Sequence, residues 1–170
     1  MRTATVRAAG VSDLDAVAAI FTHYVLHSVA TFENVPPTVA DWERKLSDLA
    51  ARGLPFLVAD LDDTVAGYAY AAPWRPKPAY QHTVENTIYL DPRFTGRGVG
   101  RTLLTALLER CADAGVRQVV AVIADSGSAA SERLHRALGF DDAGRLTDVG
   151  HKHGRWIDTL LLQRPLMLPE

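Results

Sequence analysis

The chain has 170 residues, 48% of them hydrophobic and 22% charged, and its 18 basic and 20 acidic residues leave a formal charge of −2. This length predicts a single domain over residues 1–170 that buries enough apolar surface to fold without a metal or a disulfide. The near-neutral charge argues against a nucleic-acid partner, which usually requires a basic excess. The lone Cys111 excludes an intramolecular disulfide and a cysteine-rich zinc site.

The sequence gives no indication of membrane insertion or secretion. No apolar stretch reaches the roughly 18 residues that cross a bilayer. Residues 1–10 lack the apolar segment of a signal peptide. We therefore expect a cytoplasmic protein without a membrane partner, either a small-molecule enzyme or a binding protein.

The first third of the chain predicts one short strand followed by two helices. Residues 3–8 alternate apolar and polar side chains, as a half-buried strand does. Ser12 and Asp15 have the spacing of a capping pair at the start of a helix, and Thr38 and Asp41 repeat that spacing before a second helix.

The rest of the chain alternates strands with helices. The predicted strands span residues 56–61, 64–74, 84–90, 116–124, 140–146 and 156–163, and the predicted helices span 98–115 and 129–138. The strand–helix–strand unit in the second half predicts parallel strands with a right-handed crossover. Because the sequence contains neither a repeat nor a linker, the pattern predicts one α/β domain with a mixed sheet.

A glycine-rich loop, T-G-R-G-V-G at residues 95–100, follows a predicted strand and opens a helix. Glycines let backbone amides approach an anion, and a helix N-terminus favours negative charge, so the loop predicts a phosphate site. It is not a Walker loop, because Arg101 follows Gly100 where a lysine is required. It is not a dinucleotide fingerprint, because Arg101 and Leu103 stand where glycine or alanine is needed.

Arg93, Arg97 and Arg101 lie around this loop, and residues 92–108 contain no acidic side chain. The spacing predicts a local cationic patch in a chain that is otherwise near neutrality. The alternative is an ordinary glycine-rich turn with solvated arginines.

The order of strand, glycine loop, helix, strand and a last helix ending in Gly139-Phe140 resembles the GNAT superfamily of acetyl-CoA-dependent N-acetyltransferases. Further stretches resemble its phosphinothricin and methionine-sulfoximine N-acetyltransferases. These stretches are Thr31-Phe32, Trp74-Arg75-Pro76, Thr83-Val84-Glu85, Ile88-Tyr89-Leu90, Leu134-His135 and Lys152-His153-Gly154-Arg155-Trp156-Ile157-Asp158. The resemblance spans nearly the whole chain and implies a central mixed β-sheet of about six to seven strands flanked by about four helices.

The resemblance also implies where acetyl-CoA, the expected co-substrate, binds. In the family the glycine loop holds the coenzyme pyrophosphate through backbone amides, a role that falls on Gly96, Arg97, Gly98, Val99, Gly100 and Arg101. The preceding strand pairs with the pantetheine arm, which implies Ile88, Tyr89 and Leu90. Two positions depart from the family pattern: Ser128 replaces an asparagine that touches the coenzyme, and Thr95 replaces a glutamine or arginine.

Acetyl transfer to an amine requires a group that removes the ammonium proton, and Glu85 is the candidate base. It follows Thr83 and precedes Thr87 on one face of a predicted strand, and partial burial would raise its pKa toward the working range. The alternative is an ordinary strand glutamate that faces solvent. The match of T-V-E to the family favours the catalytic role.

His135 is the second catalytic candidate, as a proton donor to the leaving thiolate or as part of a proton relay. The alternative is a histidine packed between Leu134 and Leu138 of its own helix. A backbone donor near Leu90 would stabilise the oxyanion. Cys111 lies on an apolar helix face and is interpreted as a core residue, so no covalent enzyme intermediate is expected.

The acceptor pocket is predicted mainly from the resemblance. Its candidate residues are Phe32, Trp74, Arg75, Tyr80, Glu85 and Thr87. The Arg75 guanidinium could hold a carboxylate or phosphinate through two parallel hydrogen bonds. The alternative is a proline-flanked surface turn with a solvated arginine.

The remaining expectations concern metals and assembly. His23 and His27 have the spacing of metal ligands on a helix, but no H-E-x-x-H motif accompanies them, so no metal is expected. The resemblance implies a homodimer, with His153 and Arg155 as candidate contacts across it.

These observations lead to one leading hypothesis and two alternatives. The leading hypothesis is an N-acetyltransferase that acts on a small amino-acid-like amine, with phosphinothricin as the first acceptor. Within the same class, the acceptor could instead be methionine sulfoximine, methionine sulfone or another L-amino acid. From another class, the chain could be a non-catalytic acyl-CoA-binding regulatory domain.

Overall fold

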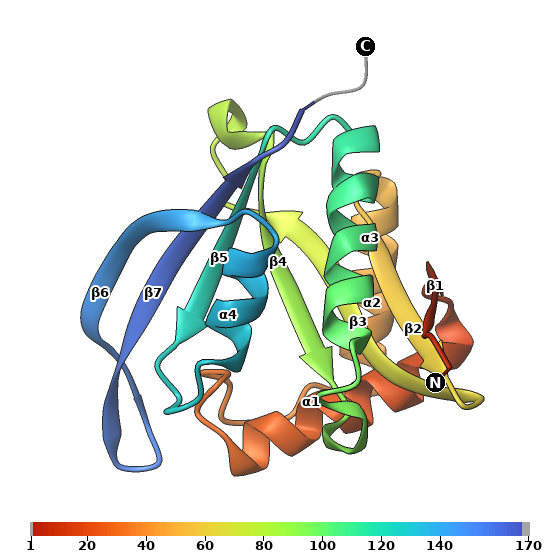
Figure 1. Cartoon of the computed structure of the whole chain (residues 1–170), viewed down its shortest axis with the longest axis horizontal. Coiled ribbons are helices and arrows are strands. Elements are labelled where there is room, and N and C mark those ends of the chain that lie inside the picture. The colour runs from red at the N-terminus through yellow and green to blue at the C-terminus, as the bar shows by residue number, and fades with distance from the viewer. Residues whose placement is uncertain (1, 168–170) are drawn as a thin grey trace.

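The computed structural model describes residues 2–167 as one seven-stranded sheet with helices on both faces (Figure 1). The strands are β1 (Thr5–Ala8), β2 (Phe56–Leu61), β3 (Thr64–Pro73), β4 (Thr83–Leu90), β5 (Gln118–Ala124), β6 (Asp141–Lys152) and β7 (Arg155–Pro165). The helices are α1 (Leu14–His27), α2 (Val39–Ala51), α3 (Val99–Asp113) and α4 (Ala130–Ala137), with short 3-10 turns η1 (Val11–Asp13), η2 (Pro78–Tyr80) and η3 (Pro92–Phe94). None of the helices within residues 2–167 is both long and apolar enough to cross a membrane.

The sheet is mixed, with strand order β1-β2-β3-β4-β5-β7-β6. Only β4 and β5 run parallel, and every other neighbouring pair is antiparallel. Helix α3 connects the two parallel strands, as the strand–helix–strand pattern requires (Figure 1). The predicted mixed sheet and the helices that flank it are confirmed.

The two faces of the sheet bury different side chains. Helices α1 and α2 cover one face over an aromatic cluster that includes Phe21, Trp42 and Tyr68. Helix α3 covers the other face over an aliphatic cluster that includes Val84 and Leu104. Since alternate strand residues point to opposite faces, each side chain of β4 belongs to one of these two layers.

The predicted capping pair is confirmed in the second helix and wrong in the first. The Asp41 amide donates to Thr38 Oγ1 at 3.1 Å, and the Thr38 amide donates to Asp41 Oδ2 at 2.8 Å. The first helix begins at Leu14, after η1, and the Gly10 amide donates to Asp13 rather than to a Ser12 cap. The physical reason is tertiary, because Arg7 of β1 holds the buried Asp13 carboxylate at 2.8 Å.

The C-terminal hairpin is longer than the sequence pattern predicts. Strands β6 and β7 span 12 and 11 residues and pair with a register shift between Leu146 and Gly150. Within the shift, Asp148 has a left-handed φ of 52°, and its amide donates to Asp158 Oδ1 at 2.8 Å. The bulge interrupts the alternation of apolar and polar residues, so the predicted strand stops at residue 146.

Candidate active site

Strands β4 and β5 separate after a short parallel ladder. Their pairing covers three residue pairs, from Thr83↔Gln118 to Glu85↔Val120, and the strands diverge beyond it (Figure 1). The Asp91 amide donates to Ala66 of β3, so the odd-numbered residues of β4 bond to β3. The backbone groups of Asn86, Ile88 and Leu90 therefore face the opening between the two strands.

The N-terminus of α3 lies next to the end of β4. Gly96 and Gly98 adopt left-handed φ values of 72° and 79°, and the space beside both Cα atoms is open. Gly98 is the N-cap, so the first amides of the helix have no intrahelical acceptor and point out of its positive end. A Cβ at Gly100 would approach Leu134 Cδ2 to 3.3 Å and Leu90 Cδ1 to 3.5 Å, so this glycine lets α3 pack closely.

The predicted cationic patch is partly neutralised, because two of its three arginines are paired with carboxylates. Arg93 pairs with Asp91 at 2.7 Å, and Arg97 pairs with Asp62 of the β2–β3 turn at 3.2 Å. Asp91 directly precedes the acid-free segment 92–108, whereas Asp62 comes from a distant turn that the spacing of residues cannot place. Among the ion pairs of residues 2–167, Arg101 has no partner, so it is the one arginine of the three that is free to meet an anion.

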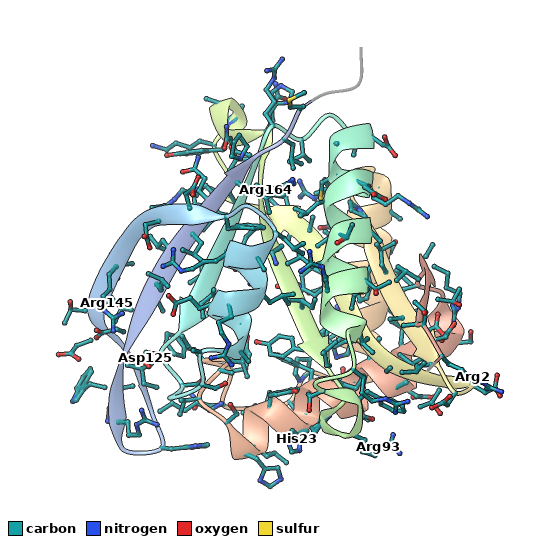
Figure 2. All side chains as sticks on the ribbon, viewed as in Figure 1. Arg2, His23, Arg93, Asp125, Arg145 and Arg164 are labelled. Carbon is teal, nitrogen blue, oxygen red and sulfur yellow. The ribbon has the colours of Figure 1, made fainter. Side chains whose placement is uncertain are left out.

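Arg93 lies on the turn before the glycine loop, and its guanidinium and that of Arg97 lie over the same Phe94 ring, at 5.5 and 5.3 Å. Figure 2 shows Arg93 at the edge of the molecule, at the turn that leads from β4 to α3. Its side chain is exposed to solvent, and its guanidinium pairs with the Asp91 carboxylate. Arg93 therefore stabilises the turn before the glycine loop.

Glu85 is half-buried on the face of β4 that carries α1 and α2. Its strand neighbours on that face, Thr83 and Thr87, are also half-buried, and Tyr89 joins the aromatic cluster. Burial raises the pKa of Glu85 above its ordinary value, and the positive charge of Lys45 partly opposes this shift. A carboxylate with a raised pKa is a better proton acceptor near neutral pH than a solvated one.

His135 points toward the other face of β4, where it is 2% exposed. Its Nδ1 lies 2.7 Å from the Ser131 carbonyl oxygen, and its Nε2 lies 2.9 Å from Asn86 Nδ2. Because the carbonyl can only accept and the amide nitrogen can only donate, this pattern assigns a neutral ring that carries its proton on Nδ1. Burial agrees with this assignment, since it lowers the pKa of His135.

Glu85 and His135 are therefore not brought together. Glu85 and Asn86 are adjacent in β4 and point to opposite faces, and His135 bonds to Asn86. Sequence reasoning missed Asn86, which lies 49 residues from its partner in the chain. Its Oδ1 is buried without a hydrogen-bond partner within residues 2–167, one residue beyond the last paired residue of β4 and β5.

The buried neutral state of His135 predicts a pH dependence of stability. Since the folded pKa lies below the ordinary 6.5, the unfolded chain binds a proton that the folded chain does not, and the free energy of unfolding decreases as the pH falls through 6.5. Denaturant unfolding of His135→Gln should show a smaller loss of stability than the wild type from about pH 7 to pH 5. His23→Gln, at an exposed histidine, is the control and should follow the wild type. Equal losses in His135→Gln and the wild type would contradict the neutral assignment.

A cavity of about 370 Å³ opens on the α1–α2 face of the sheet. It is lined by Phe21, Glu33, Val35, Pro36, Pro37, Asp41, Trp42, Lys45 and Tyr70. Tyr70 is paired with Thr87 of β4, and Lys45 Nζ lies 4.8 Å above the Tyr70 ring. The cavity therefore lies on the same face as Glu85, whose charge interacts with that of Lys45.

The predicted acceptor residues do not line this cavity. Arg75 lies over the Trp74 ring at 5.2 Å, just beyond the end of β3, and Tyr80 is exposed in η2. Phe32 lies against Gly150 of β6. A larger and more polar hollow of about 440 Å³ lies at β1 and the β2–β3 turn, where Arg7 is already paired with Asp60. It lies away from β4 and from Glu85.

Within residues 2–167, no group of three His, Cys, Asp or Glu side chains could hold a metal ion. The rings of His23 and His27 lie 5.3 Å apart on α1. Cys111 is fully buried in the aliphatic layer, and burial raises the pKa of its thiol to about 12, so it is a core residue.

The chain has close relatives among characterised proteins. A phosphinothricin N-acetyltransferase of Alcaligenes faecalis is 48% identical over 95% of this chain and 82% of its own length. A second phosphinothricin N-acetyltransferase, from Streptomyces viridochromogenes, is 41% identical over 99% of this chain and 91% of its own. An L-methionine sulfoximine/L-methionine sulfone acetyltransferase of Pseudomonas aeruginosa is 40% identical over 95% of this chain and 94% of its own.

A solved structure and a family model also match this chain. A GNAT superfamily phosphinothricin acetyltransferase of Sinorhizobium meliloti, crystallised with AcCoA, superposes with a TM-score of 0.92 and 44% identity. The match covers 97% of this chain and 89% of that one. The acetyltransferase (GNAT) family model matches residues 21–140. This chain belongs to the GNAT acetyltransferase family.

Proposed function

We propose that this protein is an acetyl-CoA-dependent N-acetyltransferase whose acceptor is phosphinothricin. Methionine sulfoximine, methionine sulfone and other L-amino acids are the second choice of acceptor. The observation that carries the proposal is the arrangement along β4, where a half-buried glutamate with a raised pKa lies next to an opened strand edge and an uncapped helix N-terminus. The names of the relatives support the choice of acceptor.

Acetyl-CoA would bind across the end of the opening. The backbone amides of residues 96–101 would hold its pyrophosphate, and the open space beside Gly96 and Gly98 allows a phosphate to approach. The backbone of Ile88 would pair with the pantetheine arm, because the Tyr89 backbone faces β3. The Leu90 carbonyl oxygen already accepts from the Tyr24 hydroxyl at 2.5 Å, which leaves the Leu90 amide free. Ser128 is exposed just before α4 and would contact the coenzyme through its hydroxyl, which accepts a bond from the Ala130 amide at 3.3 Å.

The transfer would be direct. Glu85 takes a proton from the substrate ammonium, and the neutral nitrogen attacks the thioester carbonyl carbon. The carbonyl oxygen gains negative charge, which the Leu90 amide stabilises from the strand edge. The C–S bond then breaks, and the coenzyme thiolate takes a proton from a water molecule. The hydroxide left behind takes the remaining extra proton of the amide nitrogen, and Glu85 releases its proton to solvent. The Nδ1 proton of His135 is bonded to Ser131, so we assign His135 to holding Asn86 in place rather than to proton donation.

The acceptor would lie on the face of Glu85. Lys45 and Tyr70 line the cavity on that face. The ammonium group of Lys45 can pair with the carboxylate or phosphinate of an amino-acid-like acceptor. Arg75 remains a second candidate for this anion, and Trp74 and Tyr80 remain candidates for its apolar surroundings. The chain would act as a single domain over residues 1–170 in the cytoplasm, where acetylation of phosphinothricin would provide resistance to that compound.

We also propose a homodimer. Strand β6 is an exposed sheet edge, and the β6–β7 hairpin leaves Leu146, Val149 and Trp156 exposed, with Trp156 at 67%. Exposed apolar side chains on an unpaired edge favour association with a second copy. His153 and Arg155, in and beside the hairpin turn, are candidate contacts.

Trp156→Glu should convert the dimer to a monomer, because it places a charge among the exposed apolar side chains of the β6–β7 hairpin. Light scattering coupled to size exclusion measures the mass directly. The control is Val11→Glu, at an exposed apolar residue of η1 away from the hairpin, which should stay dimeric. A wild type that elutes as a monomer at high concentration would contradict the proposal.

The acceptor is tested by thiol release from acetyl-CoA with a panel of amines. The panel contains phosphinothricin, methionine sulfoximine, methionine sulfone, ordinary L-amino acids and a lysine-containing peptide. Because Cys111 is buried, it adds little background to a thiol reagent. We expect the highest kcat/KM with phosphinothricin. Acetyl-CoA binding without amine-dependent release would instead favour the non-catalytic regulatory domain.

A further inference from the structure

We infer that Lys152 and Gly150 of β6 position the α1–α2 loop, residues 28–38, and thereby set how tightly the acceptor binds. The loop forms one wall of the cavity on the Glu85 face. The inference rests on the proposed function, because it takes that cavity as the acceptor site. It assigns both residues a positioning role, since neither lines the cavity.

The first link between hairpin and loop is a buried lysine. Lys152 is only 3% exposed, and its Nζ donates a hydrogen bond of 2.8 Å to the Thr31 carbonyl oxygen across 121 residues of sequence. Burial lowers the pKa of Lys152, and the charge of Glu33 partly opposes that shift. A buried ammonium without a partner is strongly unfavourable, so the loop is held where its carbonyl meets this group.

The second link between hairpin and loop is the contact of the Phe32 ring with Gly150. A Cβ at Gly150 would lie 2.4 Å from Phe32 Cζ and 2.5 Å from Phe32 Cε2, so the ring rests directly on the β6 backbone. Gly150 does not have a left-handed φ. The glycine is therefore required for the space it leaves rather than for its backbone conformation. Thr31 and Phe32 are adjacent, so the two links fix one short stretch of the loop.

The anchored stretch leads directly into the cavity wall. The Glu33 amide donates to Thr31 Oγ1 at 3.2 Å, and Glu33, Val35, Pro36 and Pro37 line the cavity. The other lining residues belong to α1, α2 and β3, where helix and sheet packing hold them. The loop is therefore the wall that can move. The Tyr89 hydroxyl of β4 donates to the Ala30 carbonyl oxygen at 3.5 Å, and the two closer anchors lie in the C-terminal hairpin.

Two variants test the inference, each with a matched control. Lys152→Met keeps the apolar stem and removes the donor, and Arg110→Met is its control at an exposed position of α3. Gly150→Ala displaces the Phe32 ring, and Gly10→Ala is its control, because a Cβ at Gly10 meets its nearest neighbour at 3.8 Å. We expect the acceptor KM to rise about tenfold in both variants. The kcat and the KM for acetyl-CoA should not change, and both controls should match the wild type.

Two further measurements do not depend on turnover. Hydrogen exchange should be faster in the α1–α2 loop of both variants and unchanged in α3, and calorimetry should show the same tenfold loss of phosphinothricin affinity. Unchanged loop exchange, or faster exchange with unchanged acceptor affinity, would overturn the inference. A wild type that binds phosphinothricin without transferring acetyl would reject the proposed function instead, and the exchange and affinity data would still decide the inference. If Lys152→Met fails to fold, Gly150→Ala carries the test alone.

Discussion

Replacing Glu85 with glutamine should lower kcat by about 100- to 10,000-fold, the range that general-base catalysis contributes. Glutamine has the same shape but cannot take the ammonium proton. The affinity for acetyl-CoA should be unchanged, because the proposed coenzyme contacts are backbone groups of β4 and α3 rather than the Glu85 side chain. Steady-state kinetics and calorimetry with acetyl-CoA measure the two effects separately.

The pH dependence of kcat/KM tests the role of Glu85 independently. A general base works only when it is deprotonated, so kcat/KM should fall as the pH drops through the raised pKa of Glu85, above the ordinary 4.5. In Glu85→Gln this acid limb should disappear. Glu109→Gln, at an exposed glutamate of α3, should keep both the rate and the limb. A Glu85→Gln variant that keeps the wild-type rate would remove this residue from the base role.

Reversing the charge of Arg101 should weaken acetyl-CoA binding by about tenfold or more, because a carboxylate in the first turn of α3 repels the coenzyme phosphates. The thermal stability of this variant should not decrease. An acidic side chain near a helix N-terminus is stabilising by about 0.3–1 kcal/mol, so Arg101→Glu should melt at the same or a higher temperature. Calorimetry and thermal unfolding together separate a binding defect from a folding defect.

Arg110→Glu is the matched control for this variant, since it makes the same charge change in the last turn of the same helix. There the carboxylate meets the negative end of the helix, so it should lower stability slightly without changing acetyl-CoA affinity. Equal losses of affinity in both variants would mean that net charge, rather than the helix N-terminus, governs binding. Unchanged affinity in Arg101→Glu would contradict the phosphate site.

Local signals in the sequence predicted most of the fold. Thr38 and Asp41 cap their helix as expected, because a capping pair is satisfied within one turn. The glycines at 96 and 98 adopt the left-handed conformations that a loop before a helix requires. Ser12 does not cap the first helix, because the buried Asp13 beside it pairs with Arg7 of β1. No local sequence pattern reveals this ion pair.

The site was predicted less completely, for the same physical reason. Arg97 meets Asp62, and His135 meets Asn86, only after distant segments come together. The alternation of strand residues separates Glu85 from His135 onto two faces, although both are consistent with a catalytic role when read along the sequence. The cavity near Glu85 was missed because its lining comes from a loop, two helices and a strand.

The central claim is direct acetyl transfer to a free amine, and product stoichiometry tests it most directly. Phosphinothricin and acetyl-CoA are mixed with the protein, and thiol release, N-acetylphosphinothricin and acetylated protein are measured in the same sample. The account predicts one N-acetylated amine for each thiol released, no release above background without the amine, and no acetyl group on the protein. Thiol release without N-acetylated product, or an acetyl group retained on the protein during turnover, would contradict it.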